Sequence, residues 1–202
     1  MNKFLLFFLM ILVFIFNPIS VYSLDQDAIL AGGCFWCLEH DLEKLDGVSE
    51  VVSGYSGGEL KNPTYQNHQG HQESVKVTFD PDVISYKKLL NVYFSNIDPF
   101  DNEGQFCDKG DSYRAVIFTD ENQKDVAREV RKKASLSLGV SEDNLKVSIK
   151  PKSVFWKAED YHQDFADKNE FRYKIYRYSC GRDQRLKDVW GEKAGISIEL
   201  AK

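Results

Sequence analysis

The chain has 202 residues and a formal net charge of −5, from 31 acidic and 26 basic side chains. It has no basic stripe, which argues against a nucleic-acid-binding protein. Its 4 cysteines are too few for a miniature domain held together by disulfides, and no repeat or low-complexity tract divides the chain. The length suits one domain with a full hydrophobic core.

Residues 1–23 have the composition of a signal peptide. Met-Asn-Lys precedes 13 unbroken apolar residues, and Val21 and Ser23 occupy the −3 and −1 positions of a cleavage site. Such a run is too short to span a bilayer, which takes about 20 residues. We therefore expect an exported protein, periplasmic or secreted, whose domain is residues 24–202 and which has no stable membrane insertion after signal removal. An uncleaved N-terminal membrane anchor is the alternative.

The first element of the mature chain is a short apolar strand at residues 28–31, followed by Gly32-Gly33. From Cys34 onward apolar residues recur at steps of three and four, which predicts an amphipathic helix. The glycines permit a tight turn, so Cys34 lies at the helix N-terminus, where the helix dipole favours an anion. We therefore expect a lowered pKa for Cys34 and a reactive thiol, with a buried structural cysteine as the alternative.

The rest of the pattern predicts strands that alternate with helices. Strands are expected at residues 48–53, 73–79, 114–118 and 145–149, and helices at residues 84–94 and 121–137. A polar loop carries Cys107, and an aromatic C-terminal arm at residues 173–190 carries Cys180. This order indicates an α+β fold: a single domain with an antiparallel or mixed sheet covered by helices, in a ferredoxin-like two-layer core with a long irregular C-terminal arm.

Cys34 and Cys37 form a Cys-x-x-Cys pair, and three roles are open for it. A zinc site needs about four soft ligands, and the chain has neither a second such pair nor suitably spaced histidines, so we expect no metal. A thioredoxin-like disulfide exchanger is a more serious alternative, because this pair is its signature in an exported protein. The third role is a peroxidatic or reductase cysteine with neighbouring thiols to resolve it.

Seven short motifs follow one another along the mature chain. They are Gly-Cys-Phe-Trp at residues 33–36, Gly-Tyr-Ser-Gly-Gly at 54–58, Asn-Pro-Thr-Tyr at 62–65, Gly-His-Gln-Glu at 70–73, Asp-Pro at 98–99, Asp-Lys-Gly-Asp-Ser-Tyr-Arg at 108–114 and Glu-Asp-Tyr-His-Gln at 159–163. Together they resemble the A-type peptide methionine sulfoxide reductases, with a catalytic core at about residues 28–190.

Membership in that family implies a repair enzyme. Its members reduce the S epimer of methionine sulfoxide, in proteins and as the free amino acid, through a cysteine sulfenic acid and a disulfide. They need no bound cofactor, because an external thiol reductant of the thioredoxin type regenerates them. The expected partners are therefore oxidised proteins or peptides, free methionine sulfoxide and a thioredoxin-like protein.

The resemblance assigns the two central chemical roles to Cys34 and Glu73. Cys34 matches the nucleophile that attacks the sulfoxide sulfur. Glu73 matches the proton donor, which is needed because the oxygen leaves as water only when it is protonated. Burial in an apolar pocket would raise the pKa of Glu73 and keep it protonated. Without the motif, Glu73 would be interpreted as a solvated charge.

The remaining matched residues bind the substrate. Tyr65 and Tyr113 match phenols that hydrogen-bond the sulfoxide oxygen, and Asp108 matches the polar residue beside them. Phe35 and Trp36 match the apolar cage around the substrate methyl group. Outside the motifs, all of these aromatic residues would be ordinary members of the core or its rim.

A second thiol must condense with the sulfenic acid that forms on Cys34. We expect Cys180 first, because its segment resembles the C-terminal arm of many members. Cys37 comes second because it is closest in sequence, and Cys107 comes third.

Two other classes of function are compatible with the sequence. One is an exported Cys-x-x-Cys thiol–disulfide oxidoreductase, which would not require Glu73, Tyr65 or Tyr113. The other is a non-catalytic module whose aromatic pocket binds methionine side chains, which would not require a thiol of low pKa.

Overall fold

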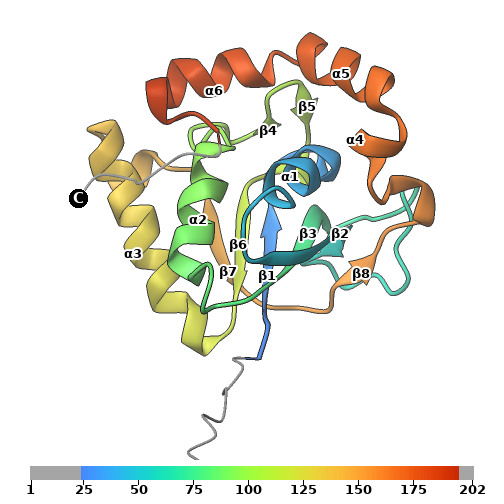
Figure 1. The fold of residues 1–202 in the computed structure, drawn as a ribbon, viewed down its shortest axis with the longest axis horizontal. Helices are drawn as coiled ribbons and strands as arrows, with labels where there is room; N and C mark the ends of the chain where they lie inside the picture. The colour runs from blue at the N-terminus through green and yellow to red at the C-terminus, as the bar shows by residue number, and fades with distance from the viewer. Residues whose placement is uncertain (1–23, 196–202) are drawn as a thin grey trace, which may run out of the picture.

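A six-stranded mixed sheet forms the centre of the computed structural model, which describes residues 24–195. The strand order is β7-β6-β1-β3-β2-β8, and every neighbouring pair is antiparallel except β6 and β7 (Figure 1). The strands are β1 (Gln26–Ala31), β2 (Val48–Ser56), β3 (Gln72–Phe79), β6 (Val116–Thr119), β7 (Ser148–Pro151) and β8 (Trp156–Lys157). A separate two-stranded ribbon pairs β4 (Gly104–Gln105) with β5 (Asp108–Lys109).

Three helices join the strands. They are α1 (Phe35–Leu42) between β1 and β2, α2 (Tyr86–Ser95) between β3 and β4, and α3 (Glu121–Leu138) between β6 and β7. Asp120 caps the first turn of α3 by accepting from two backbone N–H groups, and Gly139 ends the helix with φ +67. The helix thus covers the expected residues 121–137 and extends one residue beyond them. Short 3₁₀ turns cover Asp111–Tyr113, Glu142–Asn144, Asp160–His162 and Gly191–Lys193.

Alternation along β1 divides the core between the two faces of the sheet. Ala28 and Leu30 belong to the main cluster beneath α1 and α2, whereas Ile29 and Ala31 pack on the opposite face with Phe155. A fully buried leucine such as Leu30 contributes about 2 kcal/mol to folding. The β1 strand is therefore covered on both faces, and the α+β class with a mixed sheet is confirmed. The ferredoxin-like description of the core stays a prediction.

The last expected strand begins later than its sequence pattern suggests. We expected residues 145–149, but β7 begins at Ser148. The Lys146 N–H donates to the carbonyl of Pro99 at 2.7 Å, so the chain is bonded to another loop before it reaches β6.

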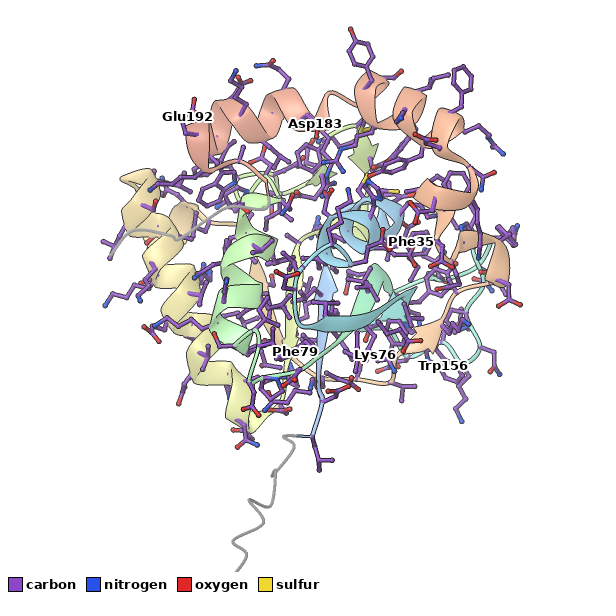
Figure 2. The ribbon with its side chains drawn as sticks, viewed as in Figure 1. Phe35, Lys76, Phe79, Trp156, Asp183 and Glu192 are labelled. Carbon is purple, nitrogen blue, oxygen red and sulfur yellow. A yellow bond between two sulfur atoms is a disulfide. The ribbon has the colours of Figure 1, made fainter. Side chains whose placement is uncertain are left out.

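The C-terminal arm is helical, and the expectation of an irregular arm was wrong there. Its helices are α4 (Phe165–Lys168), α5 (Glu170–Ser179) and α6 (Arg182–Trp190). Arg177 on α5 donates to Asp41 of α1 at 2.9 Å and to Asp183 of α6 at 2.8 Å, which fixes the arm against the core. Asp183 lies near the start of α6 (Figure 2). The Arg177–Asp41 pair joins two segments far apart in the chain, so the local pattern did not reveal it.

The expected signal peptide at residues 1–23 lies outside the described residues. Within residues 24–195, no helix has the length and apolar character needed to cross a membrane.

Candidate active site

Cys34 lies between the end of β1 and the start of α1, as expected, and is the N-cap residue of the helix. Its carbonyl accepts from the Cys37 N–H at 3.1 Å and so begins the helical hydrogen bonding. Gly33 before it has φ +84, and a Cβ there would lie 2.6 Å from the Cβ of Gln105. Glycine is therefore required for the turn that presents the thiol.

A pocket of about 50 Å³ opens beside Cys34. It is lined by Cys34, Phe35, Trp36, Tyr65, Glu73, Asp108, Tyr113 and Tyr176. The structure thus brings together all seven of the catalytic and substrate-binding residues that we expected and adds Tyr176. Phe35, which begins α1, and Phe79, which ends β3, lie at opposite ends of the sheet (Figure 2).

Glu73 is a buried carboxyl group at the start of β3, with only 2% of its surface exposed. Its Oε2 accepts from the backbone N–H of Phe35 at 3.1 Å. Burial raises the pKa of Glu73 to about 8, with further contributions from Asp108 and Cys37, and outweighs the lowering effect of the Phe35 N–H. The carboxyl group is therefore protonated at neutral pH and can supply a proton in the pocket.

Two phenols face this acid. Tyr65 and Tyr113 both line the pocket, and burial raises the pKa of both. The backbone N–H of Tyr65 donates to Glu159 at 2.9 Å, and the same carboxylate accepts from Tyr55 at 3.0 Å. Glu159 thus positions the loop that carries Tyr65. Both phenols keep their protons and can donate to an oxygen atom in the pocket.

Tyr176 is the pocket residue that sequence analysis missed. Its hydroxyl donates to Oδ2 of Asp108 at 2.5 Å, and it also contacts the Cys34 thiol. Burial raises the pKa of Asp108, although the Tyr176 hydrogen bond opposes this shift. Tyr173 and Tyr176 share the inner face of α5, so a helical assignment of the arm would have indicated the residue.

An apolar wall completes the pocket. Trp36 stacks on Phe165 with ring centroids 3.7 Å apart, and its Nε1–H donates to Nδ1 of His162 at 3.1 Å. Tyr176 meets the Trp36 ring edge-on at 5.9 Å. Phe35 is 1% exposed and fills the space behind the indole. The indole is thereby held in one orientation, which suits binding of a small apolar group such as a methyl.

The expected lowering of the Cys34 pKa was wrong for the reduced pair. Burial raises the pKa of Cys34 well above its ordinary value, since α4 and α5 cover the thiol. The interaction with Cys34, together with the charges of Arg182 and Arg177, lowers the pKa of Cys37 to about 7 against the opposing effect of burial. The two thiols are coupled, so they share one negative charge, and a proton can pass from Cys34 to Cys37 as Cys34 reacts.

The other two cysteines are bonded to each other. Cys107 and Cys180 form a disulfide, whereas Cys34 and Cys37 are free and buried. While this disulfide is present, Cys180, which we ranked first as the resolving cysteine, has no free thiol group. Cys37 lies one turn of α1 from Cys34, in the same buried cluster, and is the nearer candidate.

These groups form a consistent chemical set. A thiol with a proton acceptor, a protonated carboxyl group and two phenols surround a small pocket with an apolar wall. Such a set can attack an electrophilic sulfur atom and protonate the oxygen bound to it.

Comparisons with known proteins agree with this chemistry. The peptide methionine sulfoxide reductase family model matches residues 26–194. Peptide methionine sulfoxide reductase MsrA 2 of Caulobacter vibrioides is 46% identical over 170 residues, which cover 82% of this chain and 86% of that protein.

Solved structures show the same fold. Mxr1 from Saccharomyces cerevisiae in reduced form superposes with a TM-score of 0.67 at 28% identity, covering 72% of this chain and 86% of that chain. Mxr1 in complex with Trx2 superposes with a TM-score of 0.52 at 21% identity, covering 74% of this chain and 91% of that chain.

Proposed function

Because the chain belongs to the peptide methionine sulfoxide reductase family, and so is an enzyme that reduces methionine sulfoxide and repairs proteins, we propose that it acts on the S epimer through Cys34. The substrate is the oxidised side chain in proteins and peptides, and the free amino acid. The observation that carries this proposal is the buried Glu73 carboxyl group, with a pKa of about 8, in the same small pocket as Cys34.

The first chemical step transfers the oxygen. As Cys34 attacks the sulfoxide sulfur, its proton passes to the Cys37 thiolate, which the hydrogen bond between the two groups supports. Glu73 protonates the sulfoxide oxygen, while Tyr65 and Tyr113 hydrogen-bond it. The sulfur of the substrate gains two electrons, and the product methionine leaves. Cys34 loses two electrons and becomes a sulfenic acid, so the oxygen has moved from substrate to enzyme.

The pocket geometry also supports a preference for one epimer. The pocket lining combines hydrogen-bond donors with the aromatic rings of Phe35 and Trp36, so it offers contacts both to the oxygen and to the methyl group. The third group on the sulfur atom, which is the rest of the substrate, must then extend through the remaining opening of the pocket. Only one configuration at sulfur satisfies all three positions, and we assign it as S from the resemblance of the motifs.

The second step consumes the sulfenic acid. Cys37 attacks the Cys34 sulfur, the hydroxyl leaves as water, and a Cys34–Cys37 disulfide forms. We favour Cys37 over Cys180, because Cys37 is free and adjacent and Cys180 is bonded to Cys107. A thioredoxin-type protein supplies the two electrons that restore the thiols. The complex of yeast Mxr1 with Trx2 supports this choice of reductant.

The composition of residues 1–23 supports an exported enzyme that works outside the cytoplasm. A pure thiol–disulfide exchanger is a weaker proposal, because it leaves the buried acid and the paired phenols without a role. Reduction of the separated sulfoxide epimers with dithiothreitol as the reductant tests the proposed function. Conversion of the S epimer supports it, and failure to convert either epimer contradicts it.

A further inference from the structure

His162 lies behind the pocket, where it contacts four aromatic rings. Its ring centroid is 5.0 Å from that of Phe35, 5.6 Å from that of Trp36 and 4.6 Å from that of Tyr65, and all three of these residues line the pocket. Tyr161 packs against it at 4.2 Å. His162 is 2% exposed and is not part of the pocket lining. Its influence on the pocket must therefore pass through the rings that it contacts.

The hydrogen bond from Trp36 fixes the position of the proton on His162. The indole Nε1–H can only donate, so Nδ1 of His162 accepts and the ring proton lies on Nε2. Nε2 is buried and has no hydrogen-bond partner among residues 24–195. Burial lowers the pKa of His162 against the opposing charge of Glu159, which agrees with a neutral ring. A charged ring would carry a proton on Nδ1 as well, and two donors would then face each other.

The segment that carries His162 is fixed to β2 by hydrogen bonds of its own. The Gln163 amide donates to the carbonyl of Ser53 at 3.0 Å and accepts from the Ser53 N–H at 3.0 Å. The His162 N–H donates to the carbonyl of Glu159 at 2.9 Å, and the Glu159 carboxylate accepts from Tyr55 at 3.0 Å. The acceptor that meets the indole is therefore held in place by the sheet.

The other contacts of Trp36 restrain the indole less specifically. Phe165 stacks on it with an angle of 8° between the ring planes, and Tyr176 meets its edge. Stacked rings tolerate sliding and rotation within the plane of the stack, because apolar attraction is non-directional. A hydrogen bond is directional, since its donor angle prefers values above about 150°. The bond to His162 is thus the contact that selects one orientation of the indole.

From this arrangement, and on the basis of the proposed function, we propose that His162 is a positioning residue for the substrate methyl group. It holds the Trp36 indole in the orientation that the methyl group requires, as a neutral ring with its proton on Nε2. The methyl group takes no part in the transfer of oxygen, so it makes the same contact before and during the reaction. An interaction of this kind contributes to substrate binding and leaves the chemical step unchanged.

The first measurement follows the indole N–H groups directly. The 3 tryptophans give three indole signals in a proton–nitrogen correlation spectrum, and Trp36→Phe identifies that of Trp36. Trp190 is the internal control, because its indole N–H donates to the carbonyl of Ile97 at 2.9 Å. His162→Leu removes the acceptor, whereas His162→Asn keeps an oxygen bonded to Cγ, as Nδ1 is. We expect the Trp36 signal to move upfield and to exchange faster with solvent in His162→Leu, and to stay in place in His162→Asn.

The second measurement is a single turnover of the free thiol pair with an excess of N-acetylmethionine S-sulfoxide, quenched and analysed for the reduced product. We expect His162→Leu to raise the half-saturating concentration about tenfold, as loss of one buried hydrogen bond does. Its maximal rate should stay within about threefold of the parent. His162→Asn should restore most of the binding. His40→Leu is the control, because His40 on α1 is bonded to Lys44, and it should match the parent.

Four results would overturn the proposal. An unchanged Trp36 signal in His162→Leu would show that the hydrogen bond does not hold the indole. Equal loss of binding in His162→Asn and His162→Leu would show that the bulk of the ring matters and its acceptor does not. A lower maximal rate at an unchanged half-saturating concentration would place His162 in the chemical step. A shift of the Trp190 signal together with that of Trp36 would assign His162 to the stability of the whole fold.

Failure of the proposed function is distinguishable from these results. A parent enzyme that reduces no sulfoxide contradicts the function itself, whereas the indole spectra contain no substrate and report only on the bond between Trp36 and His162.

Discussion

The carboxyl group of Glu73 accepts a hydrogen bond from the backbone N–H of Phe35 at 3.1 Å. This N–H is one of the unpaired donors at the start of α1, directly after Cys34. A single contact therefore binds the start of β3 to the start of the helix and holds the proton donor beside the nucleophile. The acid and the thiol are positioned by the same backbone group.

Replacement of Glu73 by glutamine should remove the proton donor without removing this contact. The amide oxygen can still accept from Phe35, but the side chain cannot protonate an oxygen atom. In a single turnover we expect methionine to form about 10²–10⁴ times more slowly than in the parent enzyme, the usual effect of losing a positioned acid. In the parent enzyme the rate should fall as the pH rises through about 8, where Glu73 ionises. That fall should be absent in the variant, and an identical pH profile would show that another group donates the proton.

A second buried acid predicts how stability depends on pH. Glu39 on α1 is 1% exposed, its Oε2 accepts from the Asp164 N–H at 3.1 Å, and burial raises its pKa to about 7. Between pH 4.5 and 7 the folded chain holds a proton on Glu39 that the unfolded chain has lost. The free energy of unfolding must therefore decrease as pH rises through this range.

Glu39→Gln should reduce this pH dependence, because the amide carries no titrating proton. We expect the free energy of unfolding to fall by about 2 kcal/mol less between pH 5 and pH 8 than in the parent, from urea titrations. Glu73 contributes a fall of the same sign in both proteins, so the difference between them isolates Glu39. Glu50→Gln, at an exposed position on β2, is the control. Equal pH dependence in the parent and Glu39→Gln would contradict the buried, protonated state of Glu39.

The third prediction concerns the resolving thiol. One equivalent of sulfoxide should convert the free pair into a Cys34–Cys37 disulfide and leave Cys107–Cys180 intact, which peptide mapping detects. In Cys37→Ser the sulfenic acid should persist on Cys34 and react with dimedone. Cys180→Ser should still form the inner disulfide. Dimedone labelling in Cys180→Ser but not in Cys37→Ser would restore Cys180 to first place, as the sequence suggested.

Most of the strands and helices that the sequence predicted correctly follow from local patterns. The strand before Cys34, the paired glycines and the helix after it are adjacent in the chain, so propensity and periodicity described them correctly. The long helix α3, expected at residues 121–137, was predicted for the same reason. Order and spacing of the motifs then indicated which distant residues share the pocket.

What the sequence could not provide depends on contacts between distant segments. The bond between Cys107 and Cys180 joins residues 73 positions apart, and four cysteines allow three pairings. The pKa of Cys34 follows from burial beneath α4 and α5, which outweighs its favourable place at a helix N-terminus. Tyr176 was not predicted as a pocket residue, because it reaches Asp108 only through the packing of α5 over the pocket. In each case the deciding atoms come from the C-terminal arm.

The fourth prediction concerns export. We expect the mature enzyme to begin near Leu24, because the basic start, the apolar run and the small residues at −3 and −1 form a cleavage signal. N-terminal sequencing of protein from the exported fraction of a bacterial host measures this directly. Recovery of intact Met1 in a soluble cytoplasmic fraction would reject it, and intact Met1 in the membrane fraction would favour an anchor.

The central claim is that Cys34 reduces the S epimer of methionine sulfoxide with Glu73 as the acid. The most direct measurement gives the mature enzyme each separated epimer, with dithiothreitol as the reductant, and counts the methionine formed. Our account predicts conversion of the S epimer, no conversion of the R epimer, and no activity with either in Cys34→Ser, since an alcohol cannot form a sulfenic acid. Equal conversion of both epimers, or turnover by Cys34→Ser within about tenfold of the parent enzyme, would contradict it.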